Sequence, residues 1–407
     1  MSEWKKCKLK DICDIKSGKR LPKGSDFSPI PTEYKYIRAR DIKNGVINAD
    51  ELVCISDEVK QKISKYIVCS NDIVITIVGA SIGDVAYVTP QFDGVNLTEN
   101  AVRLTKFKSQ INPHYIFYIL NSPEYHMLMQ RIAAGAAQPK MGIYKVEAIE
   151  VAIPSIQIQN QIVEILSRYD SLIENYQKQI KLLEEAAQRL YKEWFVDIHF
   201  PGHENTKIVD GVPEGWEKKP ALDFFEMSIG KTPPRAQKQW FTKGNNGIPW
   251  VSISDMKETM FVQETAEELT QDACENYNIK VVPRGTILLS FKLTVGRVAF
   301  AGADVCTNEA IAHFQKEGDE WKAYTLMYLR NYNYDSLGNT SGISKAVNST
   351  IIKNMPFVMP CTAILQEFSQ RLLPLIKQTE NLQSQIRLLT EARDRLLPRL
   401  MSGDIKV

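Results

Sequence analysis

Two stretches of the chain repeat apolar residues at alternating spacings of four and three positions, the pattern of a helix that buries one narrow face. The first runs from Ile162 to Trp194 and the second from Phe368 to Leu400, 206 positions later. The first seam consists of Ile162, Leu166, Tyr169, Ile173, Tyr176, Ile180, Leu183, Ala187, Leu190 and Trp194, and the second of Phe368, Leu372, Leu375, Thr379, Leu382, Ile386, Leu389, Arg393, Leu396 and Leu400.

Each seam predicts a helix of about 40 residues, or roughly 60 Å at 1.5 Å per residue. Because one helix follows each globular stretch, we expect the two helices to pack as an antiparallel pair within the chain. The alternative is that each helix packs on its own domain or on a helix of a partner. Pro374 and Pro398 predict a shorter or broken second helix, since proline removes an internal hydrogen bond, although Pro374 could also begin a restarted helix.

The helices close the two copies of an internal repeat, which predicts two similar units. Short apolar runs at 73–78, 85–88, 287–291 and 298–301 predict strands, and 113–120 and 322–329 predict helices, so each unit should be α+β. Residues 135–194 align with 341–400 without a gap. Upstream, with small insertions, the matches are Trp4, Leu9 and Gly18 with Trp216, Leu222 and Gly230; 36–41 with 250–255; 72–87 with 285–300; and 98–101 with 307–310.

Composition is that of a globular protein. The chain has 407 residues, 44% of them hydrophobic and 24% charged, enough for two or three domains. The charged start is not a signal peptide, and the longest uncharged apolar stretch, 73–83, is too short to span a membrane. Seven cysteines without a CxxC pair favour reduced thiols, so we expect a cytoplasmic protein without a zinc site or a membrane partner.

No residue set predicts catalysis. Gly230-Lys231-Thr232 ends like a phosphate-binding loop, but Phe225 stands where that loop needs a glycine. Residues 121–125 only faintly resemble an amino-methyltransferase motif, and the triplets 41–43 and 255–257 only half of a nuclease set. Charge is more informative: residues 1–43 hold twelve Lys and Arg against six Asp and Glu, which favours either a polyanion-binding surface or a solvated face.

The order of these elements resembles the specificity subunit of type I restriction-modification enzymes. The resemblance rests on Trp4 to Gly18, on Pro213-Glu214-Gly215-Trp216 to Gly230-Lys231-Thr232-Pro233, on the turns at Gly83 and Gly296, and on Ile153-Pro154 and Met359-Pro360 before the helices. It covers essentially the whole chain. It implies a target recognition domain at 1–152, a central long helix at 153–200, a linker and second recognition domain at 201–358, and a C-terminal long helix at 359–407.

The resemblance also implies function and partners. Each domain would read one half of a bipartite site in double-stranded DNA, and the antiparallel helices would set the gap. Two modification (methyltransferase) subunits and motor-endonuclease subunits would bind this non-catalytic chain. S-adenosylmethionine, ATP and Mg are then expected only in the partner subunits, with no cofactor or metal in this chain.

DNA contacts are expected where the two copies carry different polar or basic residues on a shared scaffold. Arg and Lys can pair with guanine, and Gln with adenine, in the major groove, whereas other basic residues would hold phosphates. The candidates are Lys19, Arg20, Lys23, Arg38, Arg40, Ser81, Gln138 and Lys140 in the first copy, and Lys231, Arg235, Ser252, Ser254, Lys292, Arg297, Ser344 and Lys345 in the second.

Two other functions stay open at this stage. One is the recognition part of a stand-alone DNA modification enzyme, which the missing methyl-donor loop disfavours. The other is a coiled-coil assembly protein without DNA readout, which the diverged polar residues of the two copies disfavour. The apolar cluster of Tyr191, Trp194 and Phe195 could dock a modification subunit, but core packing between the helices explains it better.

Overall fold

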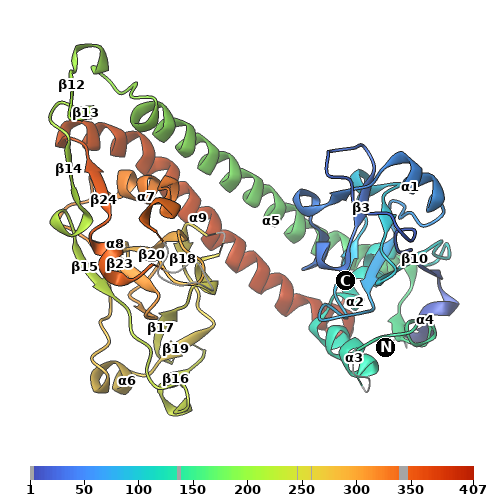
Figure 1. The fold of residues 1–407 in the computed structure, drawn as a ribbon. Helices are drawn as coiled ribbons and strands as arrows, with labels where there is room; N and C mark the ends of the chain where they lie inside the picture. The colour runs from blue at the N-terminus through green and yellow to red at the C-terminus, as the bar shows by residue number, and fades with distance from the viewer. Residues whose placement is uncertain (1–3, 135–138, 245, 258, 339–346) are drawn as a thin grey trace. The chain divides into compact units, whose positions relative to one another are not determined.

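The computed structural model describes all residues except 1–3, 135–138, 245, 258 and 339–346. The chain forms two compact units: unit 1 contains residues 1–171 and 389–407, and unit 2 contains residues 172–388 (Figure 1). Each unit holds an α+β domain together with a part of both long helices, so the predicted fold class is confirmed.

Unit 1 is built around an antiparallel sheet in the order β2-β10-β7-β8. A smaller sheet, β6-β3-β9, and the pairs β1-β11 and β4-β5 complete it. The strands are β1 (Lys5–Lys8), β2 (Asp14–Ser17), β3 (Lys35–Ile37), β4 (Ile42–Lys43), β5 (Val46–Ile47), β6 (Val53–Cys54), β7 (Ile73–Thr76), β8 (Val85–Tyr87), β9 (Asn96–Leu97), β10 (Ala101–Thr105) and β11 (Glu150–Ile153). The short helices are α1 (Asp57–Lys62), α2 (Pro113–Leu120), α3 (Pro123–Ala133) and α4 (Ile143–Glu147).

Unit 2 repeats this plan with a sheet in the order β15-β23-β20-β21-β18 and a second sheet, β16-β19-β17-β22. The pairs β14-β24 and β12-β13 flank them. The strands are β12 (Ile208–Val209), β13 (Val212–Pro213), β14 (Glu217–Pro220), β15 (Glu226–Ile229), β16 (Phe241–Thr242), β17 (Ile248–Val251), β18 (Phe261–Val262), β19 (Glu267–Leu269), β20 (Ile287–Ser290), β21 (Val298–Ala301), β22 (Cys306–Thr307), β23 (Ile311–Gln315) and β24 (Pro356–Met359). The short helices are α6 (Gln271–Asn276), α7 (Lys322–Asn331) and α8 (Ser349–Lys353).

Strand pairing corrects the predicted alignment of the two copies. Ile37 pairs in parallel with Leu97 in unit 1, and Val251 pairs in parallel with Thr307 in unit 2. Leu97 therefore corresponds to Thr307, so the prediction that 98–101 matches 307–310 is wrong by one residue. Chance similarity between residues put the alignment gap in the wrong place. Insertions are tolerated in turns, whereas a one-residue shift within a strand would turn its buried side chains outward. In the corrected alignment Glu99 corresponds to Glu309.

The predicted alignment is also wrong by one residue at the earlier strands β7 and β20. Ile73 pairs with Tyr87, and Ile287 pairs with Phe300, so Ile73 corresponds to Ile287 and not to Thr286. The turn that follows is one residue shorter in unit 2. Both copies thus keep the same ladder and differ in the loop, which is where a surface can vary without disturbing the core.

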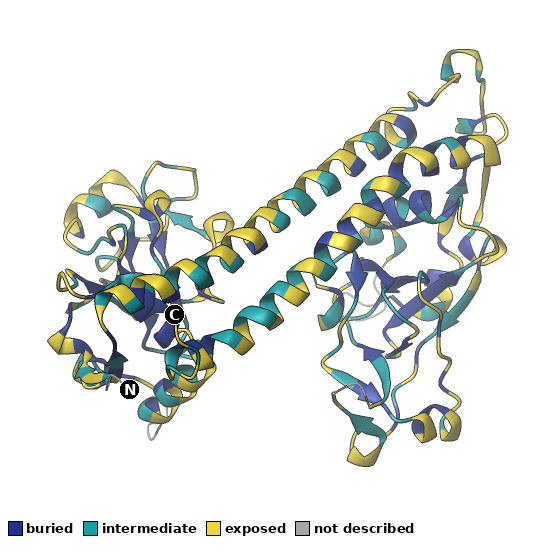
Figure 2. Ribbon diagram, turned by 180° about the vertical axis from the view of Figure 1, so that it is seen from behind, coloured by how far each residue is buried: buried dark blue, intermediate teal, exposed yellow. Residues whose placement is uncertain are grey.

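The long helices are α5 (Ile156–Tyr191), with 36 residues, and α9 (Thr362–Met401), with 40 residues. Every predicted seam residue is buried or partly buried, and Figure 2 shows buried and exposed residues separating onto different faces of each helix. The seam residues therefore lie on the more buried side of each helix. The two polar members of the second seam are also explained: Thr379 is buried and donates a hydrogen bond to the Leu375 carbonyl, and Arg393 forms an ion pair with Asp170 at 2.7 Å.

The prediction of a shorter or broken second helix is wrong, because α9 is one continuous helix of 40 residues. The first helix runs for 36 residues as α5 and continues through a π-helical turn, Lys192–Val196. A proline inside a helix costs about 3 kcal/mol. Leu372 and Ile376, on either side of Pro374, are both buried in the core of unit 2. Burial of such side chains stabilises by about 1.5–3 kcal/mol each, enough to hold the helix through the proline.

Within each unit the two helices run in opposite directions. In unit 1, Ile162 and Leu166 of α5 share a core with Leu397 and Leu400 of α9, and Asp170 pairs with Arg393. Position numbers thus rise along α5 as they fall along α9. In unit 2, the Trp194 ring just after α5 lies 5.6 Å from the Phe368 ring near the start of α9. The expected antiparallel pairing is confirmed.

The aromatic cluster after α5 belongs to the core. Tyr191 and Trp194 are buried, and Phe195 contacts the rings of Tyr324 at 4.6 Å and Phe368 at 4.8 Å. These contacts agree with the interpretation that the cluster packs in the core and does not dock a modification subunit. Among the described residues, no helix combines the length and the apolar character needed to cross a membrane.

Candidate nucleic-acid interface

A glycine ends the first sheet strand in both units and fixes the loop that follows. A Cβ atom on Gly18 would overlap the carbonyls of Leu97 and Thr98, and one on Gly230 would overlap those of Thr307 and Asn308. No other residue fits against this backbone. The next residue is a lysine in both units, and its N–H donates to the corresponding strand: Lys19 to Leu97 at 2.8 Å, and Lys231 to Thr307 at 2.9 Å.

A buried aromatic residue donates a hydrogen bond to the backbone carbonyl of each of these lysines. The Tyr36 hydroxyl donates to the Lys19 carbonyl at 2.8 Å, and the Trp250 indole N–H donates to the Lys231 carbonyl at 3.3 Å. Tyr36 and Trp250 occupy corresponding positions on β3 and β17. The backbone scaffold of the two loops is therefore the same, although the side chains that build it differ.

The residue after each lysine donates a hydrogen bond to a glutamate carboxylate. Arg20 donates to the Glu99 carboxylate at 2.5 Å, and the Thr232 hydroxyl donates to the Glu309 carboxylate. Burial alone raises the pKa of Glu309, but the Thr232 hydrogen bond and the nearby Lys292 and Arg235 cations lower it below its usual value. Sequence reasoning missed both glutamates because the misplaced gap set Glu99 opposite Asn308.

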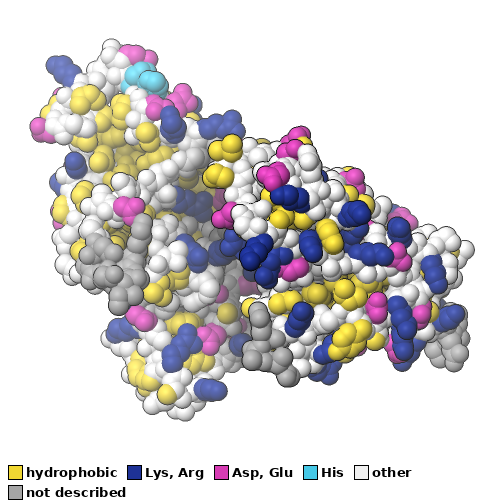
Figure 3. All heavy atoms as spheres, turned by 45° about the vertical axis from the view of Figure 1, so that its right-hand side comes forward, with side chains coloured by type: hydrophobic (Ala, Val, Ile, Leu, Met, Phe, Trp, Pro, Cys, Tyr) yellow, Lys and Arg dark blue, Asp and Glu magenta, His cyan; other side chains and the backbone are white. Residues whose placement is uncertain are grey.

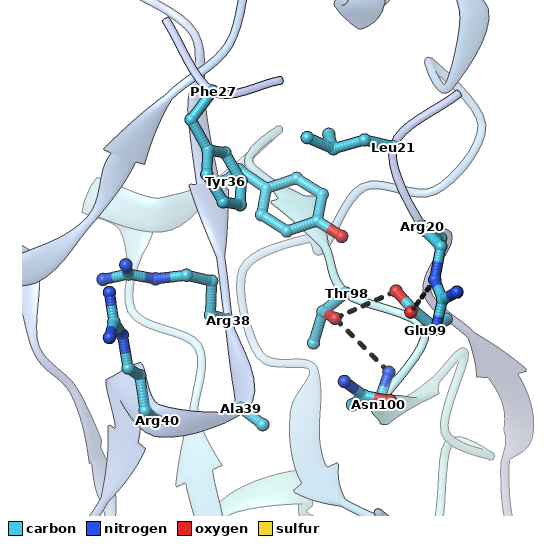
Figure 4. Close-up of a pocket in the computed structure, with 10 residues that line it drawn as sticks. All are labelled: Arg20, Leu21, Phe27, Tyr36, Arg38, Ala39, Arg40, Thr98, Glu99 and Asn100. Atoms are coloured by element: carbon cyan, nitrogen blue, oxygen red, sulfur yellow. Dashed lines mark hydrogen bonds and ion pairs between the residues drawn. The ribbon is translucent and has the colours of Figure 1, made fainter. Parts of the chain in front are cut away.

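In unit 1, three predicted arginines line one surface hollow of about 420 Å³ (Figure 4). Arg38 is forked onto the buried Asp41, with nitrogen–oxygen distances of 2.7 and 3.0 Å, and its side chain is 15% exposed. Arg40 is exposed, and in Figure 4 it extends to the same side as Arg38. The fork fixes the Arg38 guanidinium, which leaves Arg40 as the more adaptable of the two.

In unit 2, serines occupy the positions of these arginines. Asp255 caps this turn as Asp41 caps its counterpart: the Ser252 N–H donates to its carboxylate at 2.8 Å, as the Arg38 N–H donates to Asp41. The Ser252 and Ser254 hydroxyls lie 2.6 Å apart. The same turn thus presents two guanidinium groups in unit 1 and two hydroxyl groups in unit 2.

In unit 2, one guanidinium, that of Arg235, is fixed by stacking. Arg235 lies over the rings of Trp250 and Phe241, at 4.4 and 4.6 Å from their centroids, and pairs with Glu267 at 2.6 Å. Such a cation loses little conformational freedom when it binds, which suits a planar acceptor such as a base edge or a phosphate. The sequence predicted Arg235 but not the rings that hold it, which come from separate strands.

The remaining candidates lie as follows. In unit 1, Lys140 forms an antiparallel bridge with Val78 beside the turn that contains Ser81, and Lys23 is exposed in the loop after Gly18. In unit 2, Lys292 lies 5.6 Å from the Phe291 ring, and the Arg297 guanidinium donates to the Ile253 carbonyl at 2.7 Å. Gln138, Ser344 and Lys345 lie outside the described residues. Which of these side chains contact DNA stays a prediction.

On the face drawn in Figure 3, Lys and Arg side chains are interspersed with Asp and Glu. Among the described residues, no group of three His, Cys, Asp or Glu side chains is placed to hold a metal ion. What distinguishes the site is therefore its repeated backbone geometry with different side chains.

Comparison with known proteins assigns the chain to a family. The model of the type I restriction modification DNA specificity domain matches residues 1–185 and 213–391, which is most of the chain. The chain belongs to this family, and its class is that of a specificity subunit of a type I restriction-modification system.

Individual relatives agree with this assignment. The chain is 27% identical to the type I restriction enzyme MjaIX specificity subunit of Methanocaldococcus jannaschii over 312 residues, covering 74% of this chain and 71% of that one. It is 22% identical to the HindI specificity subunit of Haemophilus influenzae, with both chains covered completely. The crystal structure of a type I S subunit from M. genitalium has the same fold, with a TM-score of 0.58, 14% identity, and coverage of 98% of this chain and 96% of that one.

Proposed function

We propose that each α+β domain of this chain reads one half of a bipartite double-stranded DNA site, and that the long helices set the gap between the halves. One observation carries the proposal. The same glycine, lysine and glutamate scaffold occurs in both units, while the exposed residues on it differ: Arg40 in unit 1 stands where unit 2 has Ser254. A shared scaffold with different donors suits two different base sequences.

A matched pair of substitutions tests the two-reader assignment. Arg40→Ala should relax or weaken recognition in one half-site only, and Ser254→Ala in the other half-site only. Direct base contacts are worth about 1–3 kcal/mol, so discrimination should fall by about 5- to 150-fold if either residue reads a base. Binding of the chain with its modification subunits to a panel of single-base variants measures this. Loss at both half-sites from either single substitution would contradict the proposal.

The helices offer a test of the gap. The test is to duplicate one heptad in each helix, residues 172–178 and 385–391. This keeps both seams in phase. Seven residues lengthen a helix by about 10 Å, or about three base pairs of DNA. Methylation mapping should then find the same half-sites with a gap about three base pairs longer. Specific binding at the original gap would show that the helices do not measure it.

Two exposed leucines, at corresponding positions of the two long helices, suit the binding of two copies of one partner. Leu182 on α5 is 61% exposed and Leu388 on α9 is 54% exposed, and their numbers differ by 206, the offset of the repeat. Both lie outside the buried seam. Equivalent apolar positions on the two helices suit two identical modification subunits, with motor-endonuclease subunits joining the complete assembly.

Charge substitutions at these leucines test the stoichiometry. Leu182→Glu or Leu388→Glu alone should leave one modification subunit bound, and the double variant none, as measured by light scattering of the purified complex. Leu222→Glu, at an exposed leucine away from the long helices, is the control. Unchanged binding of two subunits by the double variant would remove these leucines from the interface.

The chain is proposed to act without catalysis of its own, in the cytoplasm, with S-adenosylmethionine, ATP and Mg bound only by partner subunits. The purified chain should transfer no methyl group from S-adenosylmethionine to DNA that carries its site. The reconstituted complex with modification subunits is the positive control. Methyl transfer by the chain alone would favour a stand-alone modification enzyme instead.

A further inference from the structure

The turn between β20 and β21 presents one leucine to solvent in a strained backbone conformation. Leu293 is 74% exposed and has a φ of +61°. The Thr294 N–H donates to the Lys292 carbonyl at 2.7 Å, so Leu293 is the central residue of a tight turn of the rare, positive-φ kind. A leucine in this region is an outlier whose strain costs of order 1–3 kcal/mol, and such strain is concentrated at functional sites.

This turn is held rigidly from inside. The buried Ser290 hydroxyl donates to the Thr294 carbonyl at 2.6 Å and accepts from the Arg297 N–H at 3.0 Å. Phe291 is fully buried, and its N–H donates to the Ala310 carbonyl at 2.9 Å. The exposed leucine therefore sits on a fixed support, and placing it against a partner requires little ordering of the backbone.

The turn belongs to the proposed reading face of unit 2. The turn begins at Phe291, whose N–H donates to the Ala310 carbonyl. Ala310 directly follows Glu309 of the loop scaffold. Arg297, at the last position of the turn, donates to the Ile253 carbonyl between Ser252 and Ser254. An apolar side chain is thus set among residues that suit a polar, negatively charged partner.

The corresponding turn of unit 1 lacks such a side chain. It contains Gly79, Ala80 and Ser81, and Gly79 has a φ of +95°. A glycine adopts this conformation without strain, whereas the leucine of unit 2 does not. The difference between the copies points to a role of Leu293 in one half-site only.

We propose that Leu293 packs against the 5-methyl group of a thymine in the major groove of the half-site read by unit 2. The inference rests on the proposed function. The thymine methyl is the apolar group that a base edge offers in the major groove, so it is the DNA feature that an exposed leucine can recognise. Lys292 beside it can hold a phosphate and keep the turn in register.

Removal of the methyl group tests the contact. Each thymine of the second half-site is replaced in turn by uracil, and the affinity of the chain with its modification subunits is measured. At one position the wild-type complex should bind about fourfold more weakly, the equivalent of about 0.8 kcal/mol for one apolar carbon. The Leu293→Ala complex should bind thymine and uracil DNA equally at that position.

Two controls separate the contact from folding. Leu293→Asn should also lose the methyl effect while keeping the turn, because asparagine tolerates positive φ. Ile208→Ala, at another exposed aliphatic residue of unit 2, should retain the fourfold effect. Thymine substitutions in the first half-site should be unaffected by all three changes.

Three results would overturn the inference. These are a uracil effect of equal size in the wild-type and Leu293→Ala complexes, no uracil effect at any position, and a second half-site without thymine on either strand. In each case intact discrimination of both half-sites by the wild-type complex would leave the proposed function standing. Loss of half-site discrimination in the wild type would instead refute the proposed function itself.

Discussion

A buried histidine should make the stability of the chain depend on pH in a defined window. His313 on β23 has no exposed surface, and its ring nitrogens lie 2.8 Å from the Ser228 hydroxyl and 2.7 Å from the Thr307 hydroxyl. Burial, with a smaller effect from the Lys280 cation, lowers the pKa of His313 to about 4. The unfolded chain has the ordinary histidine pKa of about 6.5.

The sign follows from proton binding. Between about pH 6.5 and pH 4 the unfolded chain binds a proton at His313 that the folded chain does not, so acid favours unfolding. The contribution to stability is fully present above about pH 6.5 and is lost as the pH falls toward 4. At pH 5 the loss is about 2 kcal/mol, and it approaches about 3 kcal/mol below pH 4, at 1.36 kcal/mol per pH unit.

Chemical unfolding at pH 8 and pH 5 measures this loss, with His313→Gln as the reference. Glutamine offers both a donor and an acceptor but does not titrate. The wild type should lose about 2 kcal/mol more than the variant between the two pH values. NMR of the five ¹⁵N-labelled histidines gives the pKa directly. Parallel stability curves, or an ordinary pKa for His313, would refute the reasoning.

Three further predictions concern packing. Gly18→Ala should destabilise the chain by about 1–3 kcal/mol, because the added methyl group overlaps the Thr98 carbonyl; thermal unfolding checks this. Arg393→Ala should lower the unfolding free energy by about 1–2 kcal/mol, because it breaks the pair with Asp170, as measured by urea unfolding. Trp194→Ala should cost about 3–5 kcal/mol through loss of its ring from the core, and a midpoint unchanged in a denaturant titration would contradict the packing described.

The helices and the duplication could be predicted because their signals are local and repeated. Alternation of spacings of four and three is fixed by the geometry of a helix, so each seam was found from its apolar residues alone. Pro374 misled the prediction for the second helix, because a local rule cannot include the burial of Leu372 and Ile376 against residues distant in the sequence.

The candidate site was predicted in part. Many basic candidates lie near the glycine loops, but the groups that fix them come from other strands: Glu99 beside Arg20, and Trp250 under Arg235. A sequence without strand register cannot give these pairs. An exposed leucine such as Leu293 has no sequence signal at all, since only the fold determines its exposure and backbone conformation.

The sequence by itself determined that the chain is double, that each half ends in a long amphipathic helix, and that Gly18 and Gly230 mark corresponding places. These features follow from spacing along the chain, which packing does not alter. The tertiary structure decided which residues correspond across the two copies, because strand pairing placed Glu99 with Glu309. It also decided which side chains are held and which are free to meet DNA, since burial, stacking and ion pairing arise only when distant segments pack together.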